Sequence, residues 1–145
     1  KLGWRYYSNE DLSERNIDWE KLRIENLIPE FGKELSSDSY ILEYGFEKLN
    51  GVDFKKGCYV GQENTARIKL KNKLSKRLLP IDLVEGELTQ DESIYFKENE
   101  IGKVLIEKEY PFALIKYQDE NFIGNSDFKT KEASIKINKP DWIKN

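Results

Sequence analysis

The second half of the sequence, from about Lys76 onward, consists of short stretches with the pattern of β-strands. Residues 77–83 (RLLPIDL) and 132–137 (EASIKI) carry an apolar side chain at every second position, while residues 101–107 (IGKVLIE) and 111–117 (PFALIKY) have strand composition. Glu-Gly, Glu-Asn and Asp-Glu-Asn breaks separate these stretches. Such short strands predict a small antiparallel barrel or sandwich. The alternating apolar residues are Leu79, Ile81 and Leu83 in the first stretch and Ala133, Ile135 and Ile137 in the last.

The first half has helical patterns in two places. Residues 16–32 (NIDWEKLRIENLIPEFG) distribute apolar side chains among charges, with Asn16 or Asp18 as the N-cap and a proline and a glycine at the far end. Residues 40–51 (YILEYGFEKLNG) predict a short helical stretch that ends at its Asn-Gly pair. These patterns differ from those of the second half, so we expect an α+β chain.

Residues 62–70 fit two structures. Ala66, Ile68 and Leu70 alternate with cations, which is a strand period, whereas the run GQENTAR can open a helix at Gln62. Both alternatives remain open from the sequence. The change of pattern after this segment predicts a boundary near residue 73, with a mixed part over residues 1–73 and a β domain over residues 74–145.

Missing residue types restrict the chemistry of the chain. It contains no histidine, which excludes Ser-His-Asp and Cys-His pairs and any imidazole-based metal site. Its single cysteine excludes an internal disulfide and a cluster whose several thiolates all come from this chain. The net charge of -3 does not favour binding of a polyanion by the chain as a whole.

No run of apolar residues has the length of a membrane span, and the first residues lack the apolar core of a signal peptide. We therefore expect a cytoplasmic protein with no membrane partner. Because the chain contains no methionine, we also expect it to be a fragment or a processed product.

The lone cysteine, Cys58, lies in KKGCYVGQENTAR, between Gly57 and Gly61. One interpretation is a small buried residue between structural glycines, because free cysteine is often buried. The other is a functional thiol, because Lys56 and a helix beginning at Gly61 or Gln62 would both stabilise a thiolate. A further pair, Gln62 and Glu63, suits either ligand recognition or the first turn of that helix.

Residues 56–63, KGCYVGQE, followed by Ala66 and Arg67, resemble the signature of the YgfZ/GcvT-like family, the folate-binding proteins of iron-sulfur cluster assembly and repair. The resemblance extends over most of the chain. RIENLIPEFGKEL is similar to the family's Arg-Ile-Glu helix and the Ile-Pro turn that follows it. LNGVDFKKG is similar to the segment that precedes the signature in the family. KINKPDW is similar to the usual C-terminal segment of the family. Asn64-Thr65 and LKNKLSKR depart from the family pattern.

The resemblance implies a three-lobed ring related to the aminomethyltransferase T-protein of glycine cleavage, with tetrahydrofolate in a central channel. Residues 1–73 would then be the end of the central α+β folate-binding region, and residues 74–145 the C-terminal barrel. Folate binding would also need an N-terminal half, a further partner of this chain. The implied catalytic residues are Cys58 and Lys56, and the implied cofactor-binding residues are Tyr59, Gly61, Gln62, Glu63 and Arg67.

Three functions are compatible with these observations. The signature favours an accessory protein for iron-sulfur enzymes, with client or assembly proteins as partners, in the cytoplasm of a bacterium or the mitochondrial matrix of a eukaryote. A folate-dependent aminomethyltransferase would share the fold. A nucleic-acid-binding module would use the basic residues of segment 67–77 on one strand face, although the same residues suit a solvated edge strand. These residues are Arg67, Lys69, Lys71, Lys73, Lys76 and Arg77.

Overall fold

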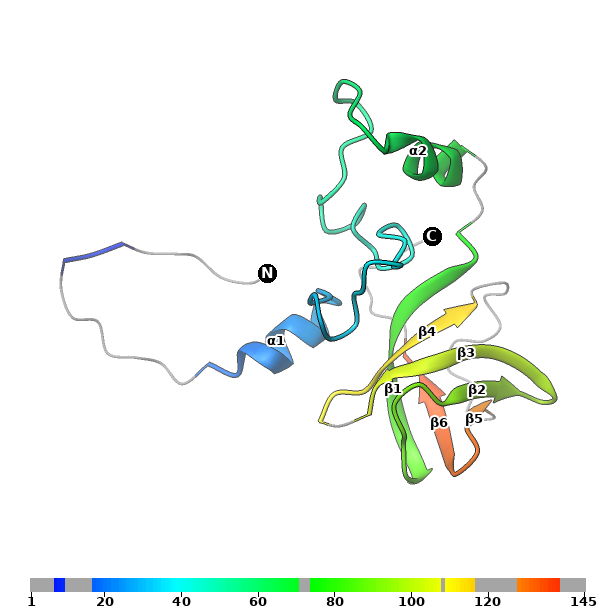
Figure 1. Ribbon diagram of the computed structural model, residues 1–145. Coiled ribbons are helices and arrows are strands. Elements are labelled where there is room, and N and C mark those ends of the chain that lie inside the picture. Colours follow the sequence, from blue (N-terminus) through cyan, green and yellow to red (C-terminus); the bar gives the residue numbers. More distant parts are fainter. Residues whose placement is uncertain (1–6, 10–16, 71–73, 108, 117–127, 139–145) are drawn as a thin grey trace.

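A computed structural model describes residues 7–9, 17–70, 74–107, 109–116 and 128–138. Helices and turns form the first part of the chain and a closed β-barrel forms the second (Figure 1). The predicted α+β class with a small antiparallel barrel is therefore confirmed. Within the described ranges, no helix combines the length and the apolar character needed to cross a membrane.

The first helix, α1 (Trp19–Glu25), is shorter than the predicted segment. Asp18 is its N-cap, as predicted, and its side chain accepts a hydrogen bond of 2.9 Å from the backbone N–H of Lys21. The helix stops because Leu27 takes a φ of 52°, a left-handed conformation that an α-helix cannot contain. Asn16, the alternative N-cap, lies outside the described residues.

Residues 41–50 form consecutive turns and not the regular helix that their sequence suggested. Gly45 has a φ of 80°, which breaks the helical path in the middle of the segment. Asn50 also has a positive φ, 57°, and the backbone N–H of Gly51 then donates to the carbonyl of Phe46 at 2.7 Å. The predicted end at Asn50–Gly51 is therefore confirmed, but the helix is not.

Residues 62–70 form helix α2 (Gln62–Leu70), so the helical alternative is correct and the strand alternative is wrong. The alternation of three apolar residues covers too few positions to distinguish the two periods. In Figure 1, α2 stands apart from the barrel, and none of its residues is buried. The predicted domain boundary near residue 73 falls outside the described residues and stays a prediction.

Six antiparallel strands make the barrel, in the spatial order β1-β4-β3-β2-β5-β6. The long first strand pairs with β4 through its first half and with β6 through its second half, and this pairing closes the barrel. The strands are β1 (Lys76–Gly86), β2 (Ser93–Phe96), β3 (Asn99–Ile106), β4 (Phe112–Lys116), β5 (Phe128–Lys129) and β6 (Ala133–Ile137).

The barrel interior is a closely packed apolar core. Ala133, Ile135 and Ile137 are all buried, as the alternation in β6 predicted. Leu83 is the exception in β1, with 46% of its surface exposed, because the register with β6 shifts between Leu83 and Glu85 and the strand departs from strict alternation. The largest fully buried side chains are Phe112, Phe128, Leu79, Ile81, Ile94, Ile115, Ile135, Ile137 and Val104.

The first part of the chain packs against the outside of β1. Leu78 is buried although the alternation directs it away from the barrel interior, because it belongs to the same apolar cluster as Ile24, Leu27 and Tyr44. Its backbone N–H donates to the carbonyl of Glu43 at 3.1 Å. The turns of residues 41–50, which lead toward the cysteine loop, are thereby fixed on the barrel.

An ion-pair network holds α1 against the turn that follows it. The guanidinium of Arg23 donates to both carboxylate oxygens of Glu34, each at 2.9 Å, and to the carbonyl of Ile28 at 2.8 Å. The side chain of Glu34 is completely buried and also accepts the backbone N–H of Glu30. Burial alone would lower the pKa of Arg23, but hydrogen bonds to Glu20 and Glu34 outweigh it and raise that pKa.

Candidate functional site: the cysteine loop

Residues 55–61 form an exposed loop between the turns of residues 41–50 and helix α2. At one end, the carboxylate of Asp53 accepts the backbone N–H of Lys55 at 2.8 Å. At the other end, Gly61 has a φ of 88°, so the chain turns in a left-handed conformation just before the helix begins. The side-chain oxygen of Gln62 accepts the backbone N–H of Tyr59 at 3.2 Å, which anchors the loop on α2.

Cys58 is a free, exposed thiol. The interpretation of this cysteine as a buried packing residue is therefore wrong, because packing requires the side chain to be surrounded by other apolar groups. The predicted helix start at Gln62 is confirmed, so three residues separate the thiol from the first helical position. The loop presents its cysteine to solvent, where a ligand or another protein can reach it.

The ammonium of Lys56 lies over the ring of Tyr59, 4.6 Å from its centroid. Such a cation–π contact restricts the position of the lysine side chain while burying little apolar area. At an exposed site it contributes about 0.5–1 kcal/mol of stabilisation. The contact brings together two of the residues that the sequence singled out. Figure 1 shows the loop next to α2 and away from the barrel.

Two cavities adjoin the loop and share the residues Val52, Asp53, Lys56 and Tyr59. The larger has a volume of about 350 Å³ and the smaller about 80 Å³. Gln62 lines the smaller one. A cation, a carboxylate, an amide and an aromatic ring therefore converge within one short stretch of chain.

The structure separates the predicted site residues into two groups. Lys56, Tyr59 and Gln62 line the cavities, whereas the remaining four do not line either of them. The four are Cys58, Gly61, Glu63 and Arg67. Gly61 shapes the backbone, and Glu63 and Arg67 are exposed on α2. The roles implied for these seven residues remain predictions.

Sequence reasoning missed Asp53 and Phe54, which line the smaller cavity. Both lie within five residues of Cys58. The presence of an acidic and an aromatic residue beside the signature is the sequence feature from which these two cavity residues could have been predicted. Phe54 is also the platform for Lys69, whose ammonium is 5.1 Å from the ring centroid and pairs with the carboxylate of Glu47. Phe54 thus links the loop to the helix.

The basic segment 67–77 does not form the single strand face that the sequence suggested. Arg67 and Lys69 lie on α2, whereas Lys76 and Arg77 lie on β1. Lys71 and Lys73 fall outside the described residues. The described cations therefore belong to two separate elements. The prediction that they form one strand-spaced row facing phosphates is wrong. The alternative prediction, a solvated edge strand, is also wrong for residues 67–70, because these residues are helical.

The loop and α2 also expose large apolar side chains. Val60 and Leu70 are almost fully exposed, and Phe54 and Tyr59 are about two-fifths exposed. Because no residue of α2 is buried, packing within the chain adds little stability to this helix. Its exposed apolar side chains are suited to contact with another protein. Among the residues described, no group of three or more carboxylate or thiol ligands is placed to hold a metal ion.

Searches of known proteins found relatives with a consistent description, although no family model matches the chain. The mitochondrial iron-sulfur cluster assembly factor IBA57 homolog of Dictyostelium discoideum is 43% identical over 77 residues, which are 50% of this chain and 19% of that protein. The homolog of Neurospora crassa is 48% identical over 54 residues, 37% of this chain and 12% of the relative. IBA57 of Mus musculus is 38% identical over 97 residues, 61% of this chain and 27% of the relative.

The fold has a solved counterpart. The glycine cleavage system aminomethyltransferase T of Bartonella henselae superposes with a TM-score of 0.58 over 84% of this chain and 37% of that one, at 11% sequence identity. The chain thus spans between about an eighth and a quarter of the length of the three relatives and just over a third of the solved structure. The names of these relatives and the shared fold are consistent with the resemblance of the chain to the YgfZ/GcvT-like family.

Proposed function

We propose that this chain supports the assembly or repair of iron-sulfur enzymes and that the loop of residues 55–61 is its working surface. The observation that carries the proposal is the exposed thiol of Cys58 in a chain whose relatives are named iron-sulfur cluster assembly factors. The partners are then the client enzymes or the assembly machinery. The exposed apolar residues of the loop and α2 supply a surface that such a partner can cover.

Cys58 acts as a single thiol in this proposal. One thiolate can serve as one ligand of a metal centre or as one nucleophile, but a cluster that needs several thiolates must take the others from a different source. Since the chain holds no second cysteine, the partner would supply them. The role assigned to Cys58 is therefore a contact between proteins and not a self-contained cluster site.

The cavities beside the loop fit part of a tetrahydrofolate molecule. Lys56 can bind a carboxylate of the ligand, the rings of Tyr59 and Phe54 can stack on an aromatic ring, and Asp53 and Gln62 can bind polar edges. The larger cavity, about 350 Å³, is at the small end of the range for ligands of this size, so further residues must complete the site. A bound reduced folate would carry one-carbon units, while the chain's own residues would bind and orient it.

The aminomethyltransferase alternative is supported by the fold alone, because the solved neighbour is only 11% identical. The names of the closer-matching relatives describe iron-sulfur assembly. The nucleic-acid alternative lacks the continuous basic strand on which it depended. Neither alternative is proposed further.

The first test concerns Cys58. In cells that depend on the intact protein for an iron-sulfur enzyme, we expect Cys58→Ser to abolish rescue of that enzyme's activity. Because the side chain is exposed, the same change should alter the free energy of unfolding by less than about 0.5 kcal/mol. Asn64→Ser, on the exposed side of α2, is the matched control and should rescue normally. Full rescue by the Cys58→Ser protein would contradict the proposed role of the thiol.

The second test concerns the folate. Tetrahydrofolate titrated into the intact protein should bind at least tenfold more weakly to Lys56→Gln than to the unchanged protein, because the cation in the cavity is lost. Lys55→Gln removes a neighbouring exposed cation that lines neither cavity, so its affinity should change less than threefold. If the two substitutions weakened folate binding equally, the affinity would depend only on the net charge of the loop, and the proposed folate site would be contradicted.

A further inference from the structure

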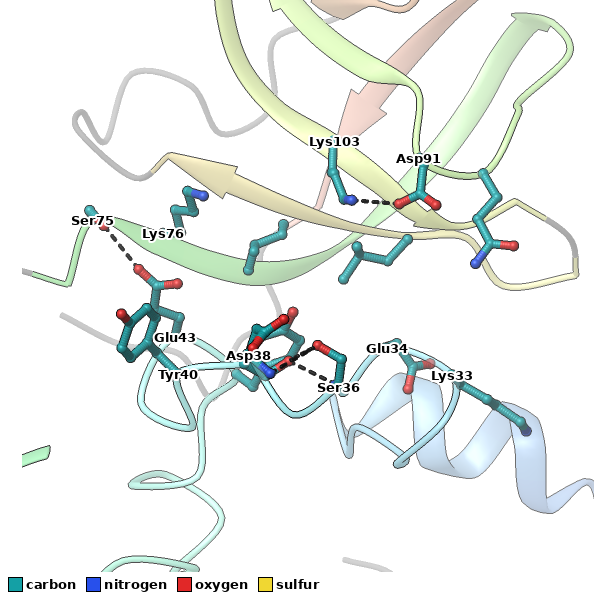
Figure 2. Close-up of a pocket in the computed structure, with 15 residues that line it drawn as sticks. Lys33, Glu34, Ser36, Asp38, Tyr40, Glu43, Ser75, Lys76, Asp91 and Lys103 are labelled. Atoms are coloured by element: carbon teal, nitrogen blue, oxygen red, sulfur yellow. Dashed lines mark hydrogen bonds and ion pairs between the residues drawn. The ribbon is translucent and has the colours of Figure 1, made fainter. Parts of the chain in front are cut away.

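A cavity larger than either of the two beside the cysteine loop lies away from that loop. Its volume is about 500 Å³, within the usual range of small-molecule sites. One wall is the outer surface of the barrel and the other is the segment of residues 33–44, as Figure 2 shows. We call this space the barrel–turn cleft. None of the residues that line the two loop cavities lines it.

The two walls of the barrel–turn cleft carry opposite free charges. On the barrel wall, Lys76 is half-buried and its ammonium makes no ion pair with any described residue, whereas Lys103 is already neutralised by Asp91. On the segment wall, the carboxylate of Asp38 has no partner among the described residues, and that of Glu43 accepts only the hydroxyl of Ser75, at 2.9 Å. Figure 2 shows Lys76 on one side and the two carboxylates on the other.

The rest of the lining is polar at the rim and apolar at its base. Ser36, Ser39 and Tyr40 bring hydroxyl groups from the segment wall, while Leu105 and Leu114 come from the barrel. Leu105 is buried and Leu114 partly buried, so the apolar base is formed by the same strands that enclose the core. A ligand in the cleft therefore meets a cation, two carboxylates and a small apolar surface.

We propose that the barrel–turn cleft binds a small zwitterion of the amino-acid class. Its carboxylate would lie against the ammonium of Lys76, and its ammonium would lie between Asp38 and Glu43. A molecule with a single charge would satisfy one wall and leave the other unpaired, which costs affinity in a partly desolvated site. The apolar base favours a short aliphatic side chain. The proposal does not depend on folate or on Cys58.

The test uses NMR titration of the 145-residue chain with leucine and glycine and with two analogues that each lack one charge. Leucine or glycine should shift the backbone amide signals of residues 36–43 and 75–77. N-acetylleucine, without the ammonium, and isoamylamine, without the carboxylate, should bind at least tenfold more weakly than leucine. If neither amino acid shifts these signals, or if both analogues bind as tightly as leucine, the proposal is overturned.

Substitutions locate the binding on the two walls. Lys76→Gln and Asp38→Asn should each weaken leucine binding at least tenfold, since each removes one of the two charges. Lys136→Gln, an exposed lysine on β6 outside the cleft, is the control and should leave the affinity within twofold. Equal weakening by Lys136→Gln and Lys76→Gln would overturn the site. Should a cleft variant fail to fold, the series of analogues on the unchanged chain still decides the question.

Discussion

At the scale of single residues, Cys58 differs from an ordinary lone cysteine because it is exposed in a loop with anchored ends. Iodoacetamide should therefore alkylate it in the folded chain at a rate within about threefold of the rate in denaturant at the same pH. Mass spectrometry of the modified chain measures this rate, and Cys58→Ser, which leaves no thiol, is the control. A thiol that reacts only after denaturation would show that the side chain is covered.

The sequence predicted much about this loop but not how its side chains lie. The glycines, the cation at Lys56 and the helix start at Gln62 follow from local patterns, and the structure agrees on the helix start. The placement of Lys56 over the Tyr59 ring depends on the path of the loop, which contains Gly57 and the left-handed Gly61. Because a glycine accepts several such conformations, the sequence alone does not choose among them.

Glu20 gives a residue-scale prediction about pH. A hydrogen bond from Arg23 lowers the pKa of Glu20 from its ordinary value of 4.5 to about 2, although burial opposes this shift and Lys33 adds to it. A lowered pKa stabilises the folded chain above the pKa of the unfolded state, and this stabilisation is lost as the pH falls from about 4.5 to about 2. Since a third of the side chain is exposed, we discount the effect to about 1 kcal/mol.

Glu20→Gln should therefore lower the free energy of unfolding by about 1 kcal/mol at pH 7, and the difference from the unchanged chain should shrink below pH 4.5. Urea unfolding at pH 7, 4 and 3 measures it. Glu25→Gln is the control, because Glu25 is exposed and its only ion pair among the described residues, with Lys21, is 3.9 Å long. A difference that stays constant down to pH 3 would contradict the pKa shift.

At the scale of elements, the sequence predicted the longer strands and missed the shorter ones. β1 and β6 show clear alternation, whereas β2 and β5 have four and two residues, too few to form a pattern. These short strands exist because neighbours pair with them, and the rings of Phe96 and Phe128, 5.2 Å apart, pack across the pair. Pairing partners far apart in the sequence are not visible in a local window.

The packing of β3 against β4 in the barrel leaves no room for a side chain at Gly102. A Cβ atom at this position would lie 2.4 Å from the carbonyl oxygen of Leu114 and 3.0 Å from the Cα of Ile115, so the backbone of β4 would have to move. Gly102→Ala should lower the free energy of unfolding by about 2–4 kcal/mol in a guanidinium titration.

Gly57 is the matched control for this substitution. A Cβ atom there meets nothing within 4 Å, and its φ is not positive, so Gly57→Ala should change the free energy of unfolding by less than about 0.5 kcal/mol. If Gly102→Ala is as stable as Gly57→Ala, then β3 and β4 do not approach each other as closely as described.

At the scale of the whole molecule, the described contacts of the first part of the chain with the barrel involve β1 and Tyr110, and the cysteine loop stays exposed. These contacts include Leu78 with the apolar cluster around Tyr44, and the hydroxyl of Tyr110, which is 3.3 Å from the carboxylate of Asp18. The loop and α2 lie beyond these contacts, at the opposite end of the 41–50 turns (Figure 1). The barrel therefore acts as the support of a surface that faces away from it.

The division of β1 between two partners has a consequence for how the chain folds as it is synthesised. The first half of β1 can pair once β4 has left the ribosome, but residues 81–86 must wait for β6, which is made after the other five strands. Until then this half-strand has free backbone groups and a row of apolar side chains, the features that promote association between nascent chains. The ring closes only after β6 has been synthesised, so this aggregation-prone stage of folding falls after the cysteine loop is already made.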